Sequence, residues 1–249
     1  MDCRRMLRYC SELDAHNDRE WFHANHREYE LAKEDFRTLL GQLRFAVAEG
    51  DPDLADDLLY MDPKDWMYRI PRDMRIHKNA PPYQPSFRAY LSRDRKSWQP
   101  IGYFLMIAPG ISCFGTGLWC ETTAATNHVR EYIQRNWEEL DDLLRQNHLA
   151  LTGNRLKTMP RGFSADHPAA EWVRMRNWTC LYDLADDALG GFDEFADKVR
   201  EMTAALAPVR RYLLDASRCC PLCFSVPALS YIRTPKRPSR ARRTQKRLF

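Results

Sequence analysis

The middle of the chain holds four short runs rich in aromatic and aliphatic residues, separated by turns and not by helical segments. They cover residues 65–70, 86–91, 101–108 and 111–119. Parallel strands need a crossover of a dozen or more residues, whereas a short turn can join antiparallel strands. The last two runs, separated by Pro109-Gly110, are typical of a hairpin. The spacing therefore predicts a mainly antiparallel sheet packed by several helices, which is an α+β fold.

Helical periodicity is strongest before these runs. Phe22, Tyr29, Phe36 and Leu43 recur every seven residues. This period places them on one face of a long N-terminal amphipathic helix that ends near Gly50.

Polar residues mark where two helices are expected to start. Asn17 with Glu20, and Asn136 with Glu139, have the spacing of a capping box, in which two side chains satisfy the first free backbone N–H groups. The remaining elements are predicted as a helix over 5–14, a helix from 122 or 123, a strand over 177–182 and a final helix over 192–213.

Charge divides the chain into two regions. The net charge is +4, but residues 218–249 hold nine Lys or Arg and no acidic residue, which leaves −5 for residues 1–217. We predict one α+β domain over 1–217 and a basic, disordered tail over 218–249. The tail is a solubilising extension or a nucleic-acid arm that binds through counterion release. No aromatic residue is interleaved with the basic residues of 233–247 to stack on bases, which favours the first reading.

No apolar run approaches the ~20 residues of a membrane span, because the longest covers only 101–108. The first five residues are not followed by the apolar core of a signal peptide. We therefore expect a cytoplasmic protein without a membrane partner.

Cysteines and histidines suggest no complete metal site. Cys220 and Cys223 have the C-x-x-C spacing of half a zinc site, and Cys219 is a third candidate ligand, but no second pair completes it. His23 and His26 lie one turn apart without a carboxylate pair at suitable spacing. We expect no metal and reduced cysteines.

One polar cluster stands out between two of the apolar runs. Arg69, Arg72, Arg75 and Lys78 fall within ten residues and precede a rigid Pro-Pro corner. Guanidinium groups are the preferred bidentate partners of carboxylates and phosphates, so the cluster has the composition of an anion site. In that reading Asn79 and Tyr83 orient the ligand. The candidates for proton transfer are Glu20, Asp73 and His77.

The same arginines have a purely structural interpretation. Arginines beside a sheet often pair with acidic residues of neighbouring elements, and Glu20, Asp65 and Asp73 are available for such a network. Asp73 would then serve to orient Arg72 or Arg75. Both interpretations stay open at this point.

This cluster resembles the signature of a bacterial and fungal family called domain of unknown function 2461. The signature is an Arg-x-x-Arg-Asp-x-Arg-aromatic stretch, followed by a short polar loop and a Tyr. Ile76 stands where the family usually has Phe, and Ala80 where it usually has Lys. The matching residues of this first segment are Arg69, Arg72, Asp73, Arg75, Lys78, Asn79 and Tyr83.

Further segments carry the resemblance over roughly residues 4–215. They include residues 160–168 and the sequence Pro109-Gly110, which precedes Gly115 and Gly117. The resemblance implies a fold and a shared polar surface, and no established activity, cofactor or reaction. The remaining matching residues are Asn17, Arg19, Glu20, Trp21, Phe22, Asn25, Tyr29, Gly115, Gly117 and Trp119.

Three functions therefore follow from the sequence. The first is binding of an anionic small molecule, bearing a phosphate or a carboxylate, at the arginine cluster, with or without catalysis. The second is a non-enzymatic protein-interaction module whose arginines are structural. The third is nucleic-acid binding through the basic tail, against which the acidic body argues.

Overall fold

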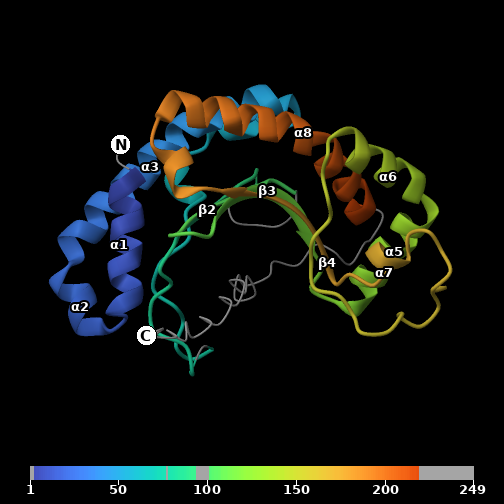
Figure 1. Ribbon diagram of the computed structural model, residues 1–249, viewed down its shortest axis with the longest axis horizontal. Helices are drawn as coiled ribbons and strands as arrows, with labels where there is room; N and C mark the ends of the chain where they lie inside the picture. Colours follow the sequence, from blue (N-terminus) through green and yellow to red (C-terminus); the bar gives the residue numbers. More distant parts are fainter. Residues whose placement is uncertain (1–2, 77, 94–100, 219–249) are drawn as a thin grey trace, which may run out of the picture.

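Two long helices and an antiparallel sheet form the centre of the computed structural model (Figure 1). The structure describes residues 3–76, 78–93 and 101–218. The sheet has the strand order β1-β2-β3-β4, and every neighbouring pair is antiparallel. The strands are β1 (Phe87–Leu91), β2 (Tyr103–Ile107), β3 (Ser112–Trp119) and β4 (Asn177–Leu184). The predicted α+β fold with an antiparallel sheet is confirmed.

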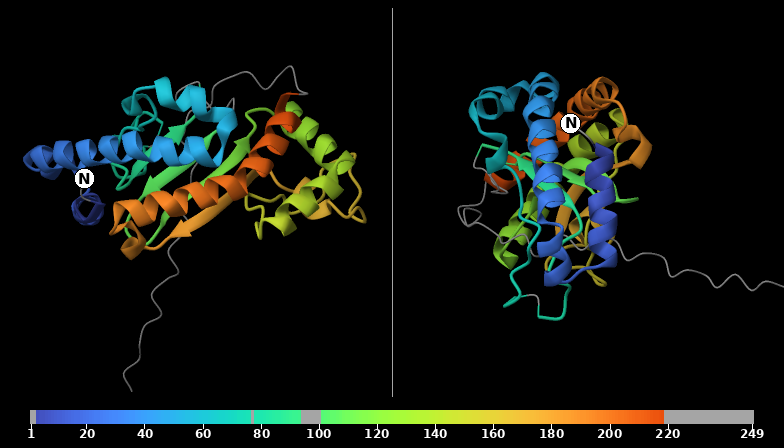
Figure 2. Two further views of the ribbon diagram at one scale, coloured as in Figure 1. Left: turned by 90° about the horizontal axis from the view of Figure 1, so that it is seen from above. Right: turned by 90° about the vertical axis from the view of Figure 1, so that its left-hand side faces the viewer.

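The helices enclose this sheet on one face and at both ends (Figures 1 and 2). The long helices α3 (His26–Gly50) and α8 (Phe192–Arg218) lie side by side on one face of the sheet. Helices α1 and α2 lie at one end, and α5, α6 and α7 at the other. The bounds of the remaining helices are α1 (Cys3–Ala15), α2 (Arg19–Ala24), α4 (Ala55–Tyr60), α5 (Thr123–Arg135), α6 (Trp137–Gln146) and α7 (Ala170–Val173), with short 3-10 turns η1 (Pro52–Leu54), η2 (Pro63–Asp65) and η3 (Asp186–Leu189).

The predicted hairpin is present between β2 and β3. Met106 pairs with Cys113, and the turn is closed by a hydrogen bond from the Ile111 N–H to the Ala108 carbonyl at 3.1 Å. Gly110 has a φ of 68°, a left-handed conformation that favours glycine. In contrast, 65–70 forms no strand: Met67 makes an isolated bridge to Ala89. Pro71, which cannot donate to a ladder, interrupts further pairing.

The N-terminal helix is divided at Asn25. Its backbone (φ −102°, ψ 19°) is not helical, and its side-chain amide donates to the Trp21 carbonyl at 2.9 Å. The predicted start is also shifted. Asp18, and not Asn17, caps α2 by accepting the Trp21 N–H at 2.8 Å. The predicted heptad face is correct, because Phe22, Phe36 and Leu43 are buried.

The second predicted capping box is wrong for a related reason. Asn136 ends α5 directly before α6 begins, and no side-chain bond caps α6. The Asn136 amide donates instead to the Tyr132 carbonyl at 2.9 Å. It therefore satisfies a carbonyl at the end of one helix, not an N–H at the start of the next.

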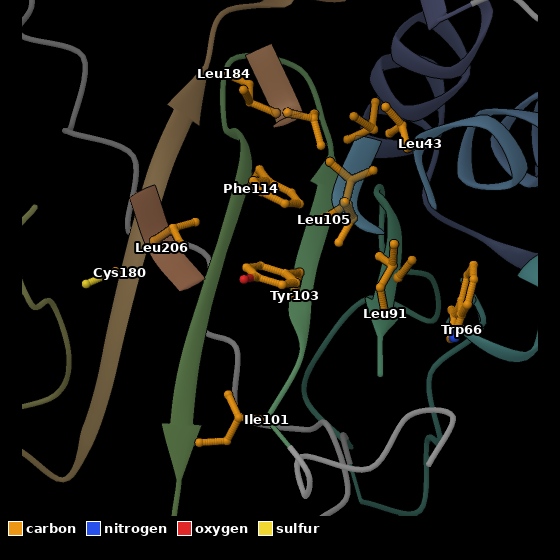
Figure 3. Packing of buried hydrophobic residues seen from close by; sticks show 14 of the residues in the cluster. Leu43, Trp66, Leu91, Ile101, Tyr103, Leu105, Phe114, Cys180, Leu184 and Leu206 are labelled. Atoms are coloured by element: carbon orange, nitrogen blue, oxygen red, sulfur yellow. The ribbon is translucent and has the colours of Figure 1, made fainter. Parts of the chain in front are cut away.

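The main hydrophobic core lies between the sheet and the two long helices (Figure 3). Strand side chains such as Leu105 and Phe114 meet Leu43 of α3 and Leu206 of α8. Tyr103 and Phe114 stack with ring centroids 5.6 Å apart and an interplanar angle of 8°. Alternate strand residues face the opposite side of the sheet and form a second, smaller cluster.

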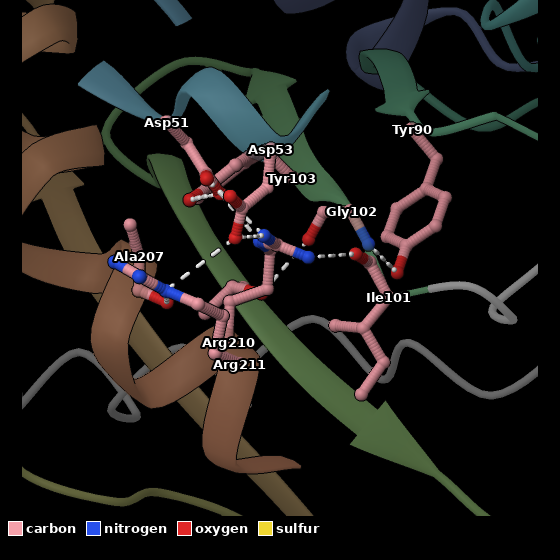
Figure 4. Close-up of polar contacts among 10 residues, drawn as sticks. Asp51, Asp53, Tyr90, Ile101, Gly102, Tyr103, Ala207, Arg210 and Arg211 are labelled. Carbon is pink, nitrogen blue, oxygen red and sulfur yellow. Dashed lines mark hydrogen bonds and ion pairs between the residues drawn. The ribbon is translucent and has the colours of Figure 1, made fainter. Parts of the chain in front are cut away.

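A buried ion pair crosses this core (Figure 4). Asp51, directly after α3, and Arg210 of α8 are both at most 1% exposed. The carboxylate binds Arg210 through two oxygens, with a separation of 3.1 Å between Nη2 and Oδ1. It also accepts the Tyr103 hydroxyl at 2.7 Å. Arg210 further donates to the Ile101 carbonyl at 3.4 Å. The pair thus joins both long helices to strand β2.

Replacement of Arg210 tests this connection. Arg210→Met leaves the buried Asp51 carboxylate without its cation, so we expect the free energy of unfolding to fall by about 3–5 kcal/mol. Urea denaturation followed by circular dichroism measures this change. Arg37→Met is the control, because its exposed ion pair with Glu34 is worth about 0–1 kcal/mol. Equal, small effects of both substitutions would contradict the role of Arg210.

Candidate functional site

The segment between η2 and β1 carries the arginine loop, defined here as residues 69–83. The loop is closed at its base by an isolated bridge between Pro71 and Tyr83 and by a hydrogen bond from the Arg72 N–H to the Pro82 carbonyl at 2.9 Å. The Gln84 N–H also donates to the Ile70 carbonyl at 2.9 Å. These contacts fix where each basic side chain starts.

Arg72 is half-buried and bound to its own loop. Nη1 donates to the Pro81 and Tyr83 carbonyls, each at 2.6 Å, and Nη2 donates to the Gln84 side-chain oxygen. All three partners are neutral. Burial lowers the pKa of Arg72, and Asp14 of α1 offsets part of this shift without forming an ion pair. Arg72 therefore closes the loop, and no carboxylate of the described residues contacts its positive charge.

Arg75 is paired locally at the tip of the loop. Its Nη2 lies 2.7 Å from Asp73 Oδ2, and its Nε lies 3.0 Å from Oδ1. The side chain is 90% exposed. Asp73 thus orients Arg75, as the structural interpretation of the cluster expected of Asp73. Arg75, Lys78 and Asn79 line an open hollow of about 530 Å³, together with Ile76 and Ala80.

The other predicted site residues are dispersed around the loop. Arg69 is exposed at its start, and its carbonyl accepts from Arg88. Glu20 is exposed in the first turn of α2 and forms no ion pair with the loop among the described residues. His77 lies outside the described residues. The structure therefore brings Arg75, Lys78 and Asn79 together, with Arg72 held separately at the base.

The ring of Tyr83 is packed away from the loop tip. It is 7% exposed and stacks on Phe22, with centroids 4.1 Å apart and an interplanar angle of 9°. Its backbone forms a reciprocal pair with the Asn17 side chain: the Asn17 amide donates to the Tyr83 carbonyl, and the Tyr83 N–H donates to Asn17 Oδ1, both at 3.0 Å. We call this pair the Asn17–Tyr83 clamp.

The clamp explains why distant motif residues occur together. Asn17 and Phe22 hold Tyr83, and the Tyr83 carbonyl also accepts from Arg72. Trp21, the neighbour of Phe22, packs with its ring centroid 5.8 Å from that of Tyr9. Arg19 is exposed, and Asn25 joins α2 to α3. The motif residues between Asn17 and Asn25 therefore position the base of the arginine loop against the N-terminal helices.

The glycine motif in β3, Gly115 and Gly117, has a packing role. A Cβ atom on Gly115 would lie 2.1 Å from the Cys180 carbonyl oxygen, and one on Gly117 would lie 2.5 Å from Thr179 Cγ2. Both distances are too short for a side chain. The glycines permit the close approach of β3 and β4, while Trp119 at the end of β3 packs against the second hydrophobic cluster.

The sequence analysis missed Arg88, which lies in β1 beside the arginine loop. Its Nη2 donates to the Arg69 carbonyl at 3.3 Å, and its Nε is buried without a hydrogen-bond partner. Burial and the nearby charge of Arg72 lower the pKa of Arg88 to about 10. No carboxylate of the described residues forms an ion pair with it. A charged residue within the apolar strand Phe87–Leu91 was the signal that could have identified it.

These features define an α+β domain with a clamped arginine loop at the edge of an antiparallel sheet. The chain matches the family model DUF2461, a conserved hypothetical protein, over residues 5–212. It therefore belongs to this family, and the resemblance seen in the sequence is confirmed. No curated protein and no solved structure matches the chain.

Two further findings concern metals and membranes. No three His, Cys, Asp or Glu side chains gather as a metal site would require within 3–76, 78–93 and 101–218. Cys219, Cys220 and Cys223 lie outside these ranges. Within the same ranges, no helix has the length and apolar character needed to cross a bilayer.

Removal of the clamp tests its importance. Asn17→Ala deletes both hydrogen bonds and leaves the N–H of the buried Tyr83 without a partner, so we expect a loss of about 1–3 kcal/mol in unfolding free energy. Chemical denaturation measures the loss. Asp18→Ala removes one exposed helix cap and should cost about 1 kcal/mol. A smaller effect of Asn17→Ala than of this control would argue against the clamp.

Proposed function

We propose that this protein binds a small anionic molecule, bearing a phosphate or a carboxylate, at the edge of the sheet where Arg72 and Arg88 lie. The observation that carries the proposal is the state of Arg88. Its guanidinium is largely desolvated, stands beside a second guanidinium, and has no carboxylate partner among the described residues. An isolated buried charge is costly, and an anion would offset that cost.

Arg210, which is fully buried in the main core, shows the contrast. Arg210 is more deeply buried than Arg88, and direct contact with the Asp51 carboxylate balances its charge. Arg72 cannot serve as a counter-charge to Arg88, since both are cationic. A phosphate or carboxylate presents the oxygen pairs that two guanidinium groups recognise.

The remaining residues of the arginine loop have supporting roles in this proposal. Arg69, Arg75, Lys78 and Asn79 are exposed, so they would attract an anion and contact its outer part. Tyr83 would act indirectly, because its carbonyl holds Arg72. Glu20, Asp73 and His77 stay candidates for proton transfer if a reaction occurs.

Arg88→Met is the decisive substitution. At pH 7 both the folded and unfolded chains keep the Arg88 proton, so the full cost of burying that charge is present; it declines only above pH 10, where the folded form loses the proton first. We therefore expect Arg88→Met to stabilise the ligand-free protein by about 1–3 kcal/mol. The same substitution should abolish stabilisation by anions. Thermal unfolding of the full chain, with and without ligand, measures both effects.

The probes are inorganic phosphate, a phosphomonoester and a dicarboxylate, with sodium chloride at matched ionic strength. A bound anion at a hundred times its dissociation constant should stabilise the chain by ~2.7 kcal/mol. Arg37→Gln, which changes an exposed arginine of α3, should leave that response intact. A destabilised Arg88→Met variant, together with no anion response in the natural chain, would favour the interaction module with structural arginines. Nucleic-acid binding through the tail stays a prediction, because 219–249 lie outside the described residues.

A further inference from the structure

The second face of the sheet, opposite α3 and α8, carries an apolar cluster without helix residues. Its buried members are Tyr90 of β1, Phe104 and Met106 of β2, Ala108 and Cys113. They are between 0% and 7% exposed. Tyr68, Ile111 and Trp119 pack against them, and these also come from strands or from the segments beside them.

No described helix covers this face. In Figure 1 the long helices lie on the other side of the sheet, and helices α1, α2, α5, α6 and α7 stand at its ends. A sheet with one solvated face usually alternates apolar and polar residues, whereas β2 is buried at all five positions. The composition of β2 is that of a strand covered on both faces, and the described residues place no helix over the second one.

The chain that follows α8 has a suitable composition. Residues 219–232 contain no Asp, Glu, Lys, Arg or His and include Leu222, Phe224, Leu229 and Tyr231. The character changes abruptly at Arg233, after which eight of seventeen residues are Lys or Arg. An apolar segment of this length is costly to leave in water, whereas the basic part is not.

The position and reach of this segment also fit. The last turns of α8 pack on α5 and α6, where the Tyr212 hydroxyl donates to the Asn136 carbonyl at 3.0 Å. Helix α8 therefore ends near the Trp119 end of β3, from which α5 continues (Figure 1). Fourteen extended residues span at most about 46–50 Å, and the eight residues of β3 span about 27 Å. The segment is long enough to cross the face.

We propose that residues 219–232 pack across the second face of the sheet as its cover. Pro221 and Pro227 cannot donate backbone hydrogen bonds, so the segment is suited to cover a face and not to add a strand at an edge. The basic residues 233–249 would then project from the rim of this face.

Two cysteines allow the cover to be tested in the full chain. Cys113 lies on the second face, and Cys180 of β4 lies in the main core, where its thiol donates to the Ala150 carbonyl at 3.5 Å. Burial raises the pKa of both thiols to about 12, so labelling of either requires exposure of its sulfur to water. Labelling with an alkylating reagent, read for each peptide by mass spectrometry, separates them from the cysteines of the C-terminal segment.

The test variant is Phe224→Asp with Leu229→Asp, which places two charges in the proposed cover. We expect labelling of Cys113 to rise by about tenfold or more, as a loss of about 1.4 kcal/mol in docking would produce. Labelling of Cys180 should not change. The matched control, Thr234→Asp with Thr244→Asp, adds the same charge beyond residue 232 and should leave Cys113 protected.

Three outcomes would overturn the proposal. The first two are equal labelling of Cys113 in the natural chain and both variants, and equally fast labelling of Cys113 in the natural chain and in urea. Faster labelling of both Cys113 and Cys180 would indicate general unfolding; the milder Leu229→Ser variant then repeats the comparison. Protection of Cys113 that disappears on dilution would identify a second copy of the chain as the cover instead.

Discussion

The Asp51–Arg210 ion pair is the contact that joins the parts of this structure. It connects the end of α3 with α8, and through the Tyr103 hydroxyl and the Ile101 carbonyl it reaches β2. Hydrophobic packing alone permits helices to slide along a sheet, because apolar contacts have little direction. A buried carboxylate with three fixed donors does not permit this, since any shift would leave a charge without its partner.

Arg88 and Arg210 carry the same side chain, but their charges are balanced in different ways. Arg210 is neutralised within the fold, so its charge supports the arrangement of the helices. Arg88 stands beside Arg72, donates to the Arg69 carbonyl at 3.3 Å and lies 5.9 Å from the centre of the Tyr68 ring, so burial of its charge is opposed by a second cation and balanced by no carboxylate of the described residues. Arg130, which is 4% exposed, likewise has only neutral hydrogen-bond partners among the described residues. The proposal for Arg88 therefore rests on its position beside Arg72 at the edge of the sheet.

The sequence predicted the antiparallel sheet, the hairpin at Pro109-Gly110 and the apolar face of α3, because these depend on local spacing. It failed at Asn17 and Asn136, because each side chain donates to a carbonyl outside the helix that it was expected to cap. Asn17 donates to the Tyr83 carbonyl, and Asn136 donates to the Tyr132 carbonyl of the preceding helix. Within the candidate site, the sequence identified the arginines of the loop because several basic residues fall within ten positions. Their partners were not identified, because Arg72 binds backbone carbonyls that no sequence pattern distinguishes. Arg88 was missed because a lone charge inside a strand is significant only once its surroundings are known.

The Asn17–Tyr83 clamp has a consequence for the order in which the molecule is assembled. It joins positions 66 residues apart, so its closure requires a large loss of chain entropy that only later contacts repay. The arginine loop obtains its base only when the N-terminal helices meet a segment that is synthesised much later. Both halves of the clamp nevertheless leave the ribosome within the first third of the 249 residues, whereas the Asp51–Arg210 pair spans 159 positions. The base of the arginine loop is therefore synthesised in full before the central ion pair that joins the two long helices.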